Sequence, residues 1–409
     1  NHSPGTMSVV SSFFELVDYT APDAIFELTK TYNADPVPHK VNLGQGTYKD
    51  ENGNPWILPA VRLAKEKIKD SNHEYLPILG LPSLRTLAAD LVFGKHSAAI
   101  QEDRVASCQA LSGTGALHIA GTMLKQALGR DITVYITKPS WSNHRQVFES
   151  IGLTVREFNY SSSAGVDMQS LIQTLNEAAP KSIFVFHASA HNPSGWDYSP
   201  EQWKQIGAIM KERQLFPLFD AAYLGLTSGD YDRDAFAIRY FADELGLEIA
   251  VCLSFAKSMG LYGERVGLCA FSSNTPTITA AVESSLARMI RVEISNPPAF
   301  GARIAAAVLE DEELYAQWRK DLVTMSSRIV EMRWQLYQGL TELCTPGDWK
   351  RITEQKGMFC ILGLTPDQVH HLQKEYHIYM AESSRVSIAG LNGSNVRYVA
   401  ECINQTVKR

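Results

Sequence analysis

Residues 254–267 read SFAKSMGLYGERVG, and they follow the apolar run EIAVCL at residues 248–253. The apolar run is typical of a buried strand, and the ends of such strands are where α/β proteins bind ligands. Lys257 lies close to Phe255 and Met259, so we expect it to be partly buried. Burial disfavours the charged ammonium and lowers its pKa from about 10.4. The stretch therefore predicts a nucleophilic amine at the end of a buried strand.

Two side chains of phosphate-binding type flank this lysine. Ser254 precedes it, and Arg265, whose guanidinium can donate paired hydrogen bonds, follows it. An amine beside phosphate ligands suggests a lysine that forms a Schiff base with a phosphorylated aldehyde, pyridoxal phosphate. The alternative from this stretch alone is a surface lysine on a loop, with Arg265 paired to Glu264.

The surrounding sequence, between residues 132 and 272, alternates short apolar runs with helical patterns such as residues 202–213. Continuous apolar character predicts strands covered on both faces, as in a mainly parallel α/β sheet with right-handed crossovers. The predicted strands are residues 132–136, 155–158, 183–186, 216–219, 249–253 and 266–271. Polar clusters follow four of them, at residues 139–144, 187–195, 220–223 and 254–257, and this is the ligand-binding pattern of such sheets.

Upstream of these strands, Ser112, Gly113 and Thr114 open a helix that is predicted to run to about Leu128. Free backbone N–H groups at a helix start make an anion site, which suits a phosphate. No apolar strand of good length is predicted before it, and the third glycine of a dinucleotide-binding motif is absent. A plain helix start would have the same sequence.

The remaining chain is predicted to be mostly helical. Asp23 is expected to cap a first helix, and residues 291–298 are expected to form a proline-ended link. The other predicted elements are helices at residues 23–32, 57–70, 81–93, 301–343 with a break near 310–313, and 366–376, a strand at 358–362, and a last helix.

Composition limits the classes of function. The chain has 409 residues and a net charge of −6, without a basic cluster or a long apolar run, so neither nucleic acid nor a membrane is an expected partner. Six scattered cysteines indicate no metal site and no disulfide framework, and they favour a reducing compartment. We expect a cytoplasmic protein, with a mitochondrial location as the open alternative. Residues 1–6 precede Met7 and resemble a vector-derived segment.

In combination, several motifs resemble the aspartate aminotransferase family, the pyridoxal-phosphate-dependent aminotransferases of fold type I, alpha subfamily. The resemblance covers nearly all of residues 9–408. It implies a large domain, residues 54–320, with a mainly parallel seven-stranded sheet between helices, and a smaller α/β domain from residues 7–53 and 321–409. The motifs are VNLG (41–44), EYLPI (74–78), LSGTGAL (111–117), AHNPSG (190–195), FDAAYLG (219–225), SFAKSMGLYGERVG (254–267) and SNPP (295–298).

The resemblance also implies roles for single residues. Lys257 would carry the cofactor as an imine and move the substrate's α-proton. Asp220 would pair with the ring nitrogen, and His144 and His187 match residues that orient this aspartate, although each could equally be a hydrogen-bonded core histidine. The other implied cofactor contacts are Trp141, which would stack on the ring, Asn192 and Tyr223 at its phenolic oxygen, and Ser112, Gly113, Thr114, Ser254, Arg265 and the neighbouring subunit's Tyr75 at the phosphate.

Two arginines would select the substrate in a homodimer with shared active sites. Arg385 would bind the α-carboxylate, and Arg291 of the neighbouring subunit would bind the distal carboxylate, so dicarboxylic amino acids are favoured. Gly46, Trp141 and Asn192 would complete the substrate site. The implied reaction is ping-pong transamination between L-aspartate and 2-oxoglutarate.

Two stretches depart from the family's usual sequence. Residues 45–48 read QGTY where VGAY is usual, and residues 291–298 read RVEISNPP where RPMYSNPP is usual. Glu293 would compete with the substrate if it approached Arg291, and would point elsewhere if the segment were extended. The alternatives are therefore a pyridoxal-phosphate enzyme with an aromatic or specialised substrate or a changed reaction, and a non-catalytic binding protein on the same scaffold.

Overall fold

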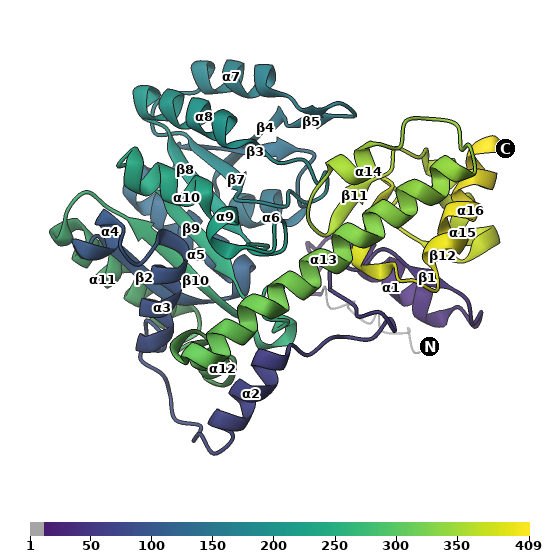
Figure 1. Ribbon diagram of the computed structural model, residues 1–409. Coiled ribbons are helices and arrows are strands. Elements are labelled where there is room, and N and C mark those ends of the chain that lie inside the picture. Colours follow the sequence, from purple (N-terminus) through teal and green to yellow (C-terminus); the bar gives the residue numbers. More distant parts are fainter. Residues whose placement is uncertain (1–11) are drawn as a thin grey trace, which may run out of the picture.

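The computed structural model describes residues 12–409. Residues 1–11, which include the expected vector-derived segment and Met7, lie outside the described residues. The larger part of the molecule contains a seven-stranded sheet with the order β2-β10-β9-β8-β7-β3-β4 (Figure 1). All six predicted strands are present: β3 (Thr133–Lys138), β4 (Thr154–Asn159), β7 (Ile183–His187), β8 (Phe216–Ala221), β9 (Ala250–Ser254) and β10 (Val266–Ser272).

The sheet is mainly parallel, as predicted. Neighbouring strands from β4 to β9 run parallel, whereas β10 runs antiparallel to both β9 and β2. Alternate residues of β10 pack on opposite faces: Leu268 and Ala270 join one core cluster, and Cys269 and Phe271 join the other. Because both faces are buried, the strand has a continuous apolar sequence.

The seventh strand corrects the prediction that no strand of good length precedes the helix at Ser112. β2 (Val105–Leu111) pairs with β10 along its length and leads directly into α5 (Ser112–Leu128). The polar Gln109 in its centre is fully buried. Its side chain accepts a hydrogen bond from the Leu81 backbone N–H at 3.0 Å and donates one to the Pro298 carbonyl at 2.8 Å. These bonds let a polar residue occupy a buried strand.

Helices cover both faces of the sheet (Figure 1). One face carries α5, α6 (Asn143–Ser150) and α11 (Pro276–Glu293). The other face carries α3 (Pro82–Phe93), α7 (Met168–Glu177), α8 (Pro200–Arg213), α10 (Phe236–Arg239) and α12 (Phe300–Glu310). Smaller elements of this part are α2 (Pro59–Ile68), α4 (Ala98–Gln101), α9 (Tyr231–Asp234) and the hairpin of β5 (Ser161–Ser162) and β6 (Gly165–Val166).

A long helix, α13 (Glu312–Glu342), runs from the sheet toward the smaller part of the molecule (Figure 1). It is separated from α12 by Asp311, whose carboxylate accepts hydrogen bonds from two backbone N–H groups and caps α13, so the predicted break is confirmed. The smaller part contains α1 (Ala24–Ala34), β1 (Val41–Asn42), α14 (Arg351–Glu354), β11 (Phe359–Ile361), α15 (Pro366–Tyr376), β12 (Ile378–Tyr379), β13 (Arg385–Ser387) and α16 (Val396–Lys408).

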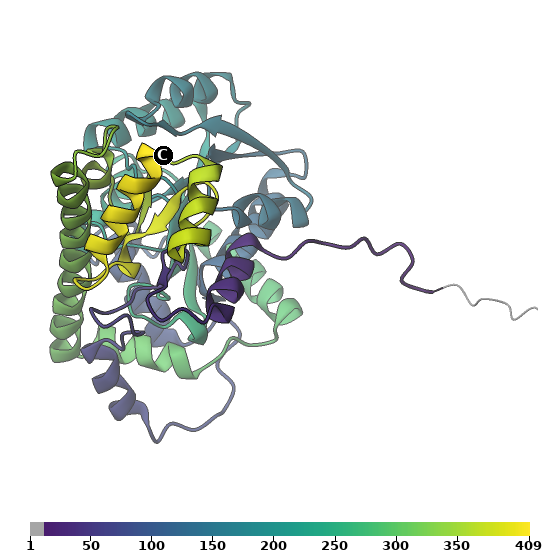
Figure 2. The ribbon, with the colours of Figure 1, turned by 90° about the vertical axis from the view of Figure 1, so that its right-hand side faces the viewer.

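Both ends of the chain contribute to this smaller part. β1 pairs with β12 in parallel, and β11 pairs with β13 in an antiparallel manner. The first described residues run away from the rest of the chain (Figure 2), and Phe13, Leu16 and Tyr19 are almost fully exposed there. Within residues 12–409, no helix combines the length and the apolar character that crossing a bilayer would require.

Candidate active site

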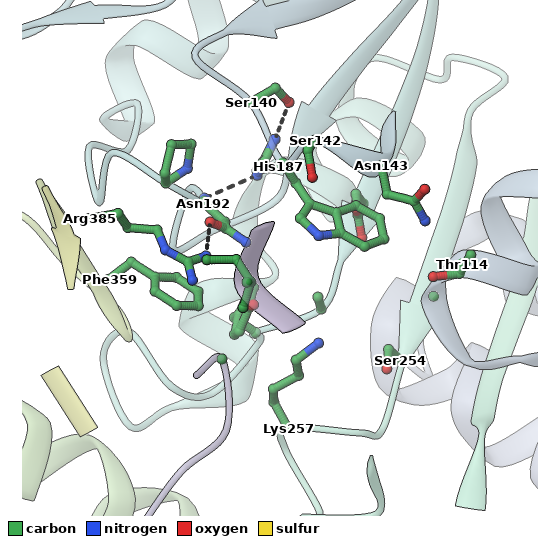
Figure 3. A pocket seen from close by; sticks show the side chains of 18 of the residues that line it. Thr114, Ser140, Ser142, Asn143, His187, Asn192, Ser254, Lys257, Phe359 and Arg385 are labelled. Carbon is green, nitrogen blue, oxygen red and sulfur yellow. Dashed lines mark hydrogen bonds between the residues drawn. The ribbon is translucent and has the colours of Figure 1, made fainter. Parts of the chain in front are cut away.

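A cavity of about 590 Å³ lies at the carboxyl ends of β7, β8 and β9 (Figure 3). Strand ends, the start of α5 and loops from the smaller part all contribute to its wall. Most of the predicted site residues line it, namely Gly46, Ser112, Gly113, Thr114, Trp141, Asn192, Asp220, Tyr223, Ser254, Lys257, Arg265 and Arg385. Tyr75 and Arg291 do not.

Lys257 follows β9, and its side chain extends into the cavity (Figure 3). Its Nζ lies 5.2 Å from the centre of the Tyr223 ring. Burial lowers the pKa of this amine below its ordinary value; the charge of Asp220 opposes the shift and that of Arg265 reinforces it. A larger share of the amine is therefore proton-free near neutral pH, as a nucleophile or base requires.

Asp220, near the end of β8, is held by a buried histidine. His144 Nε2 lies 2.7 Å from Asp220 Oδ2, and His144 Nδ1 lies 2.9 Å from Ser140 Oγ. Burial alone would raise the pKa of Asp220, but the hydrogen bond from His144 and the nearby charges, including that of Lys257, outweigh it and leave the pKa below its ordinary value. Asp220 is therefore an oriented, ionised carboxylate in the cavity wall.

The two histidines have different positions in this network. His144 contacts Asp220 directly, whereas His187 lines the cavity and lies 3.5 Å, through Nε2, from Ser140 Oγ. Burial lowers the pKa of His187 well below its ordinary value. The geometry thus makes His144 the positioning partner of the carboxylate and leaves His187 as a neutral ring at the cavity.

Serine, arginine and backbone groups form an anion cradle at another end of the cavity. Ser112 Oγ and Ser254 Oγ lie 2.7 Å apart, and no side chain caps the start of α5, so its first N–H groups remain free. Arg265 has a left-handed backbone, with φ of 53°, and its Nη1 donates to the Tyr262 carbonyl at 3.1 Å. Within residues 12–409, Arg265 and Glu264 do not form the ion pair that is the alternative interpretation of the sequence.

Arg385 enters the same cavity from β13 in the smaller part. Its Nη1 donates to Asn192 Oδ1 at 3.1 Å and its Nη2 donates to the Gly44 carbonyl at 2.8 Å. The guanidinium carbon lies 4.4 Å from the centre of the Phe359 ring. No carboxylate of the described chain lies within ion-pair distance of this buried side chain. The site therefore holds an oriented guanidinium that can receive an external carboxylate.

Arg291 and Tyr75 lie on the surface of this single chain. Arg291 belongs to the last turn of α11, so the prediction of a link beginning at residue 291 is wrong. Residues two apart in a helix point about 200° from each other. Accordingly, Glu293 contacts His118 Nδ1 at 2.8 Å, whereas Arg291 donates to Ser295 Oγ. Glu293 therefore forms no ion pair with Arg291 in the described chain, and the guanidinium of Arg291 stays available to a substrate carboxylate.

Some cavity residues were not among the predicted site residues. Asp23 caps α1, as predicted, but together with Ile25 and Phe26 it also forms part of the wall. Phe359, in β11, lies against Arg385, and the sequence marked it only as part of a short strand. The pairing of β11 with β13 brings Phe359 beside Arg385 from a distant position, so no local pattern points to it.

Residues 45–48, which depart from the usual sequence, lie only partly in the cavity wall. Gly46 lines the cavity, and a Cβ built there would lie 3.3 Å from Phe359 Cζ, so glycine suits the close approach. Gln45 does not line the cavity. The hydroxyl of Thr47 is buried without a hydrogen-bond partner among the described residues. The substitutions at positions 45 and 47 therefore do not place a new side chain in the cavity of this chain.

Comparison with known proteins gives full-length matches. The family model of the class I and II aminotransferases matches residues 38–403. The cytoplasmic aspartate aminotransferase of Saccharomyces cerevisiae is 45% identical over 97% of this chain and 98% of its own length. The cytoplasmic aspartate aminotransferase of Gallus gallus is 43% identical over 98% of this chain and 100% of its own length.

Solved structures agree with these matches. The structure of the aspartate aminotransferase from S. cerevisiae cytoplasm has a TM-score of 0.94 and 46% identity, covering 97% of this chain and 98% of that one. An aromatic-amino-acid aminotransferase from Burkholderia pseudomallei, covalently bound to pyridoxal phosphate, has a TM-score of 0.94 and 38% identity, covering 97% of this chain and 100% of that one. The chain belongs to the class I and II aminotransferase family, and its full-length relatives include aspartate aminotransferases.

Proposed function

We propose that this aminotransferase exchanges the amino group of L-aspartate with 2-oxoglutarate, forming oxaloacetate and L-glutamate, with pyridoxal phosphate as its cofactor. One observation carries the proposal. A single cavity combines a buried amine at Lys257, an oriented carboxylate at Asp220, the cradle around Ser254 and Arg265, and the guanidinium of Arg385. The names of the full-length relatives support the choice of aspartate as substrate.

The donor set of the cavity fits pyridoxal phosphate. Ser112, Ser254, Arg265 and the N–H groups of Gly113 and Thr114 suit a phosphate dianion. For the ring of the cofactor, an ionised Asp220 suits a protonated ring nitrogen, and His144 keeps the carboxylate in one orientation. Trp141 offers a flat aromatic surface, and Tyr223 and Asn192 offer hydrogen-bonding groups for the phenolic oxygen.

When bound, pyridoxal phosphate supplies an aldehyde that takes up the amino group and a ring that accepts the electron pair left at the α-carbon. Lys257 would provide the amine that holds the cofactor and, once the substrate's amino group has displaced it, would accept the α-proton as a free base, for which a lowered pKa is suited. The ionised Asp220 would stabilise a protonated ring nitrogen. Arg385 orients the substrate through its α-carboxylate.

A homodimer would complete the substrate site. Arg291 and Tyr75 are exposed and lie outside the cavity of their own chain, while the family resemblance assigns both to the site of a neighbouring subunit. The exposed apolar side chains of Phe13, Leu16 and Tyr19 also favour association. In such a dimer Arg291 would bind the distal carboxylate, with Glu293 directed toward His118.

Steady-state rates with a panel of amino donors test the substrate. We expect kcat/KM for aspartate with 2-oxoglutarate to exceed that for phenylalanine, and Arg291→Ala to reduce the aspartate value far more than the phenylalanine value. Preference for an aromatic donor, or equal losses in the variant, would overturn the dicarboxylate assignment. Full cofactor loading with no turnover of any donor would point to the binding-protein alternative.

Two further expectations remain proposals. We propose a cytoplasmic location, which the names of the yeast and chicken relatives support. We also propose a division into a large domain, residues 54–320, and a small domain, residues 7–53 and 321–409. The second boundary falls inside α13, so this helix would connect the two domains as one rigid rod.

A further inference from the structure

A second cavity, of about 400 Å³, lies between α13 and the loop that follows β7. Its lining includes Arg333 of α13 and Lys356, which follows α14. Ser189, Asp197 and Arg233 also line it. This cavity has no role in the chemistry proposed above.

Three cations and two carboxylates line this second cavity. Arg233, Arg333 and Lys356 form no ion pair with any carboxylate among residues 12–409. Arg333 is 2% exposed, and its Nη atoms donate to the carbonyls of Ile352 and Gly357 at 2.9 and 2.7 Å. Carbonyl oxygens carry only a partial charge, and the three cations of the wall exceed its two carboxylates, Asp197 and Asp234, by one charge.

Hydrogen-bond donors of the same wall also lack partners. The hydroxyls of Ser189, Tyr198 and Thr227 and the Nε of Arg333 are buried, and none has a hydrogen-bond partner among the described residues. Buried polar groups are normally paired, and an arginine Nε can only donate. Only Arg333 Nε must donate, and the three hydroxyls can also donate, so the four groups suit an acceptor-rich ligand.

Two acidic residues of the wall are already occupied by donors. Asp197 accepts hydrogen bonds from the backbone N–H groups of Ala190 and His191, at 2.8 and 3.0 Å. Asp234 accepts from the Gly225 N–H at 2.9 Å. Burial raises the pKa of both carboxyls, that of Asp197 to about 6, so the repulsion between Asp197 and an anion weakens as the pH falls below 6. The available groups of the wall are thus mainly cations and donors.

We propose that this second cavity binds a small oxyanion, in the form of a carboxylate or a phosphate group. Its location would connect it to the active site. Ser189 lines both cavities, and Asp197 holds the backbone immediately before Asn192, whose side chain contacts Arg385 at 3.1 Å. An oxyanion in the second cavity therefore contacts the same loop that positions Asn192.

Equilibrium dialysis of the cofactor-loaded enzyme tests the site with two probes, labelled inorganic phosphate and labelled acetate. The double variant Arg233→Gln/Lys356→Gln removes two exposed cations of the wall, and exposed side chains can be replaced with little effect on folding. Arg62→Gln/Lys320→Gln is the matched control, because it removes the same charge from exposed positions outside both cavities.

We expect the wild type and the control to bind one more oxyanion per chain than the cavity variant, or to bind it at least about tenfold more tightly. Binding of phosphate alone or acetate alone would identify which group the site takes, and binding of both would show a general oxyanion site. Equal binding by all three proteins, or equal losses in both double variants, would overturn the proposal, because the cavity cations would then have no specific role.

Discussion

At the residue scale, Arg385 shows how one side chain can be both fixed and available. Its Nη atoms are held by Asn192 and Gly44, and Phe359 packs against the guanidinium. Burial lowers the pKa of this guanidinium, although arginine remains charged at any pH at which the protein folds. The planar group is therefore presented in one orientation, which a flexible ammonium group cannot reproduce.

Arg385→Lys should retain the positive charge and lose this orientation. We expect kcat/KM for aspartate to fall by about 100-fold, because two fixed hydrogen bonds and the paired contact with the carboxylate are lost. The cofactor absorbance should be unchanged. Arg62→Lys, at an exposed position, is the control. A loss of less than threefold in the Arg385 variant would mean that charge alone suffices there.

Asp197 gives a prediction for stability against pH. Burial raises the pKa of its carboxyl to about 6, despite hydrogen bonds from Ala190 and His191. The native state therefore binds a proton near pH 5 that the unfolded state does not, so this group's contribution to stability falls as pH rises through 6. Asp197→Asn cannot titrate. We expect the free energy of unfolding of this variant minus that of the wild type, measured by urea denaturation, to be about 1 kcal/mol lower at pH 5 than at pH 8. A constant difference would contradict the raised pKa.

At the element scale, α1 has an unusual dependence on its cap. None of its residues is buried, yet Asp23, Ile25 and Phe26 form part of the active-site wall. With little packing to hold it, the helix relies on the Asp23 carboxylate, which accepts hydrogen bonds from the Ile25 and Phe26 N–H groups at 2.9 and 3.2 Å. A short helix without such support is only marginally stable.

Asp23→Ala should therefore destabilise α1 by about 1 kcal/mol and accelerate hydrogen exchange of its backbone amides. The KM for substrate should rise, because the wall that α1 provides becomes mobile. Asp23→Ser keeps a capping oxygen without the charge and should restore slow exchange. If the serine variant exchanged as fast as the alanine variant, the negative charge of Asp23, rather than its capping oxygen, would be responsible.

Elements that carry their own pattern could be predicted from the sequence. The strands β7, β8, β9 and β10 are mainly apolar runs, and α15 begins and ends at the predicted residues. β2 could not be predicted, because Gln109 is satisfied by partners far away in the sequence. The last turn of α11 was not predicted either, because residues 291–298 end in two prolines, and this pattern predicts a link.

The candidate site divides in the same way. The motif residues Lys257, Asp220 and Ser254 belong to strand ends, and the parallel sheet brings such ends to one edge. Phe359 reaches the cavity through the pairing of β11 with β13, and the α1 residues reach it through the fold of the smaller part, so local sequence could not indicate them. The hydrogen bond that distinguishes His144 from His187 also depends on three-dimensional geometry.

At the scale of the whole molecule, shared active sites lead to a complementation experiment. Lys257→Ala and Arg291→Ala should each form dimers with low activity toward aspartate. A mixed dimer would have one site with both wild-type residues, provided that Arg291 comes from the opposite subunit. Refolding an equal mixture should restore about a quarter of the wild-type activity, because about half of the dimers are mixed and each has one intact site. No gain after mixing would contradict the shared site.

The central claim is that Lys257 holds the cofactor in the cavity beside Asp220. The most direct test is borohydride reduction of the purified enzyme, followed by proteolysis and mass spectrometry. We expect the mass of reduced pyridoxal phosphate on the peptide that contains Lys257, and no such adduct in Lys257→Ala. Finding the adduct on a different lysine, or on none in cofactor-loaded protein, would contradict the account.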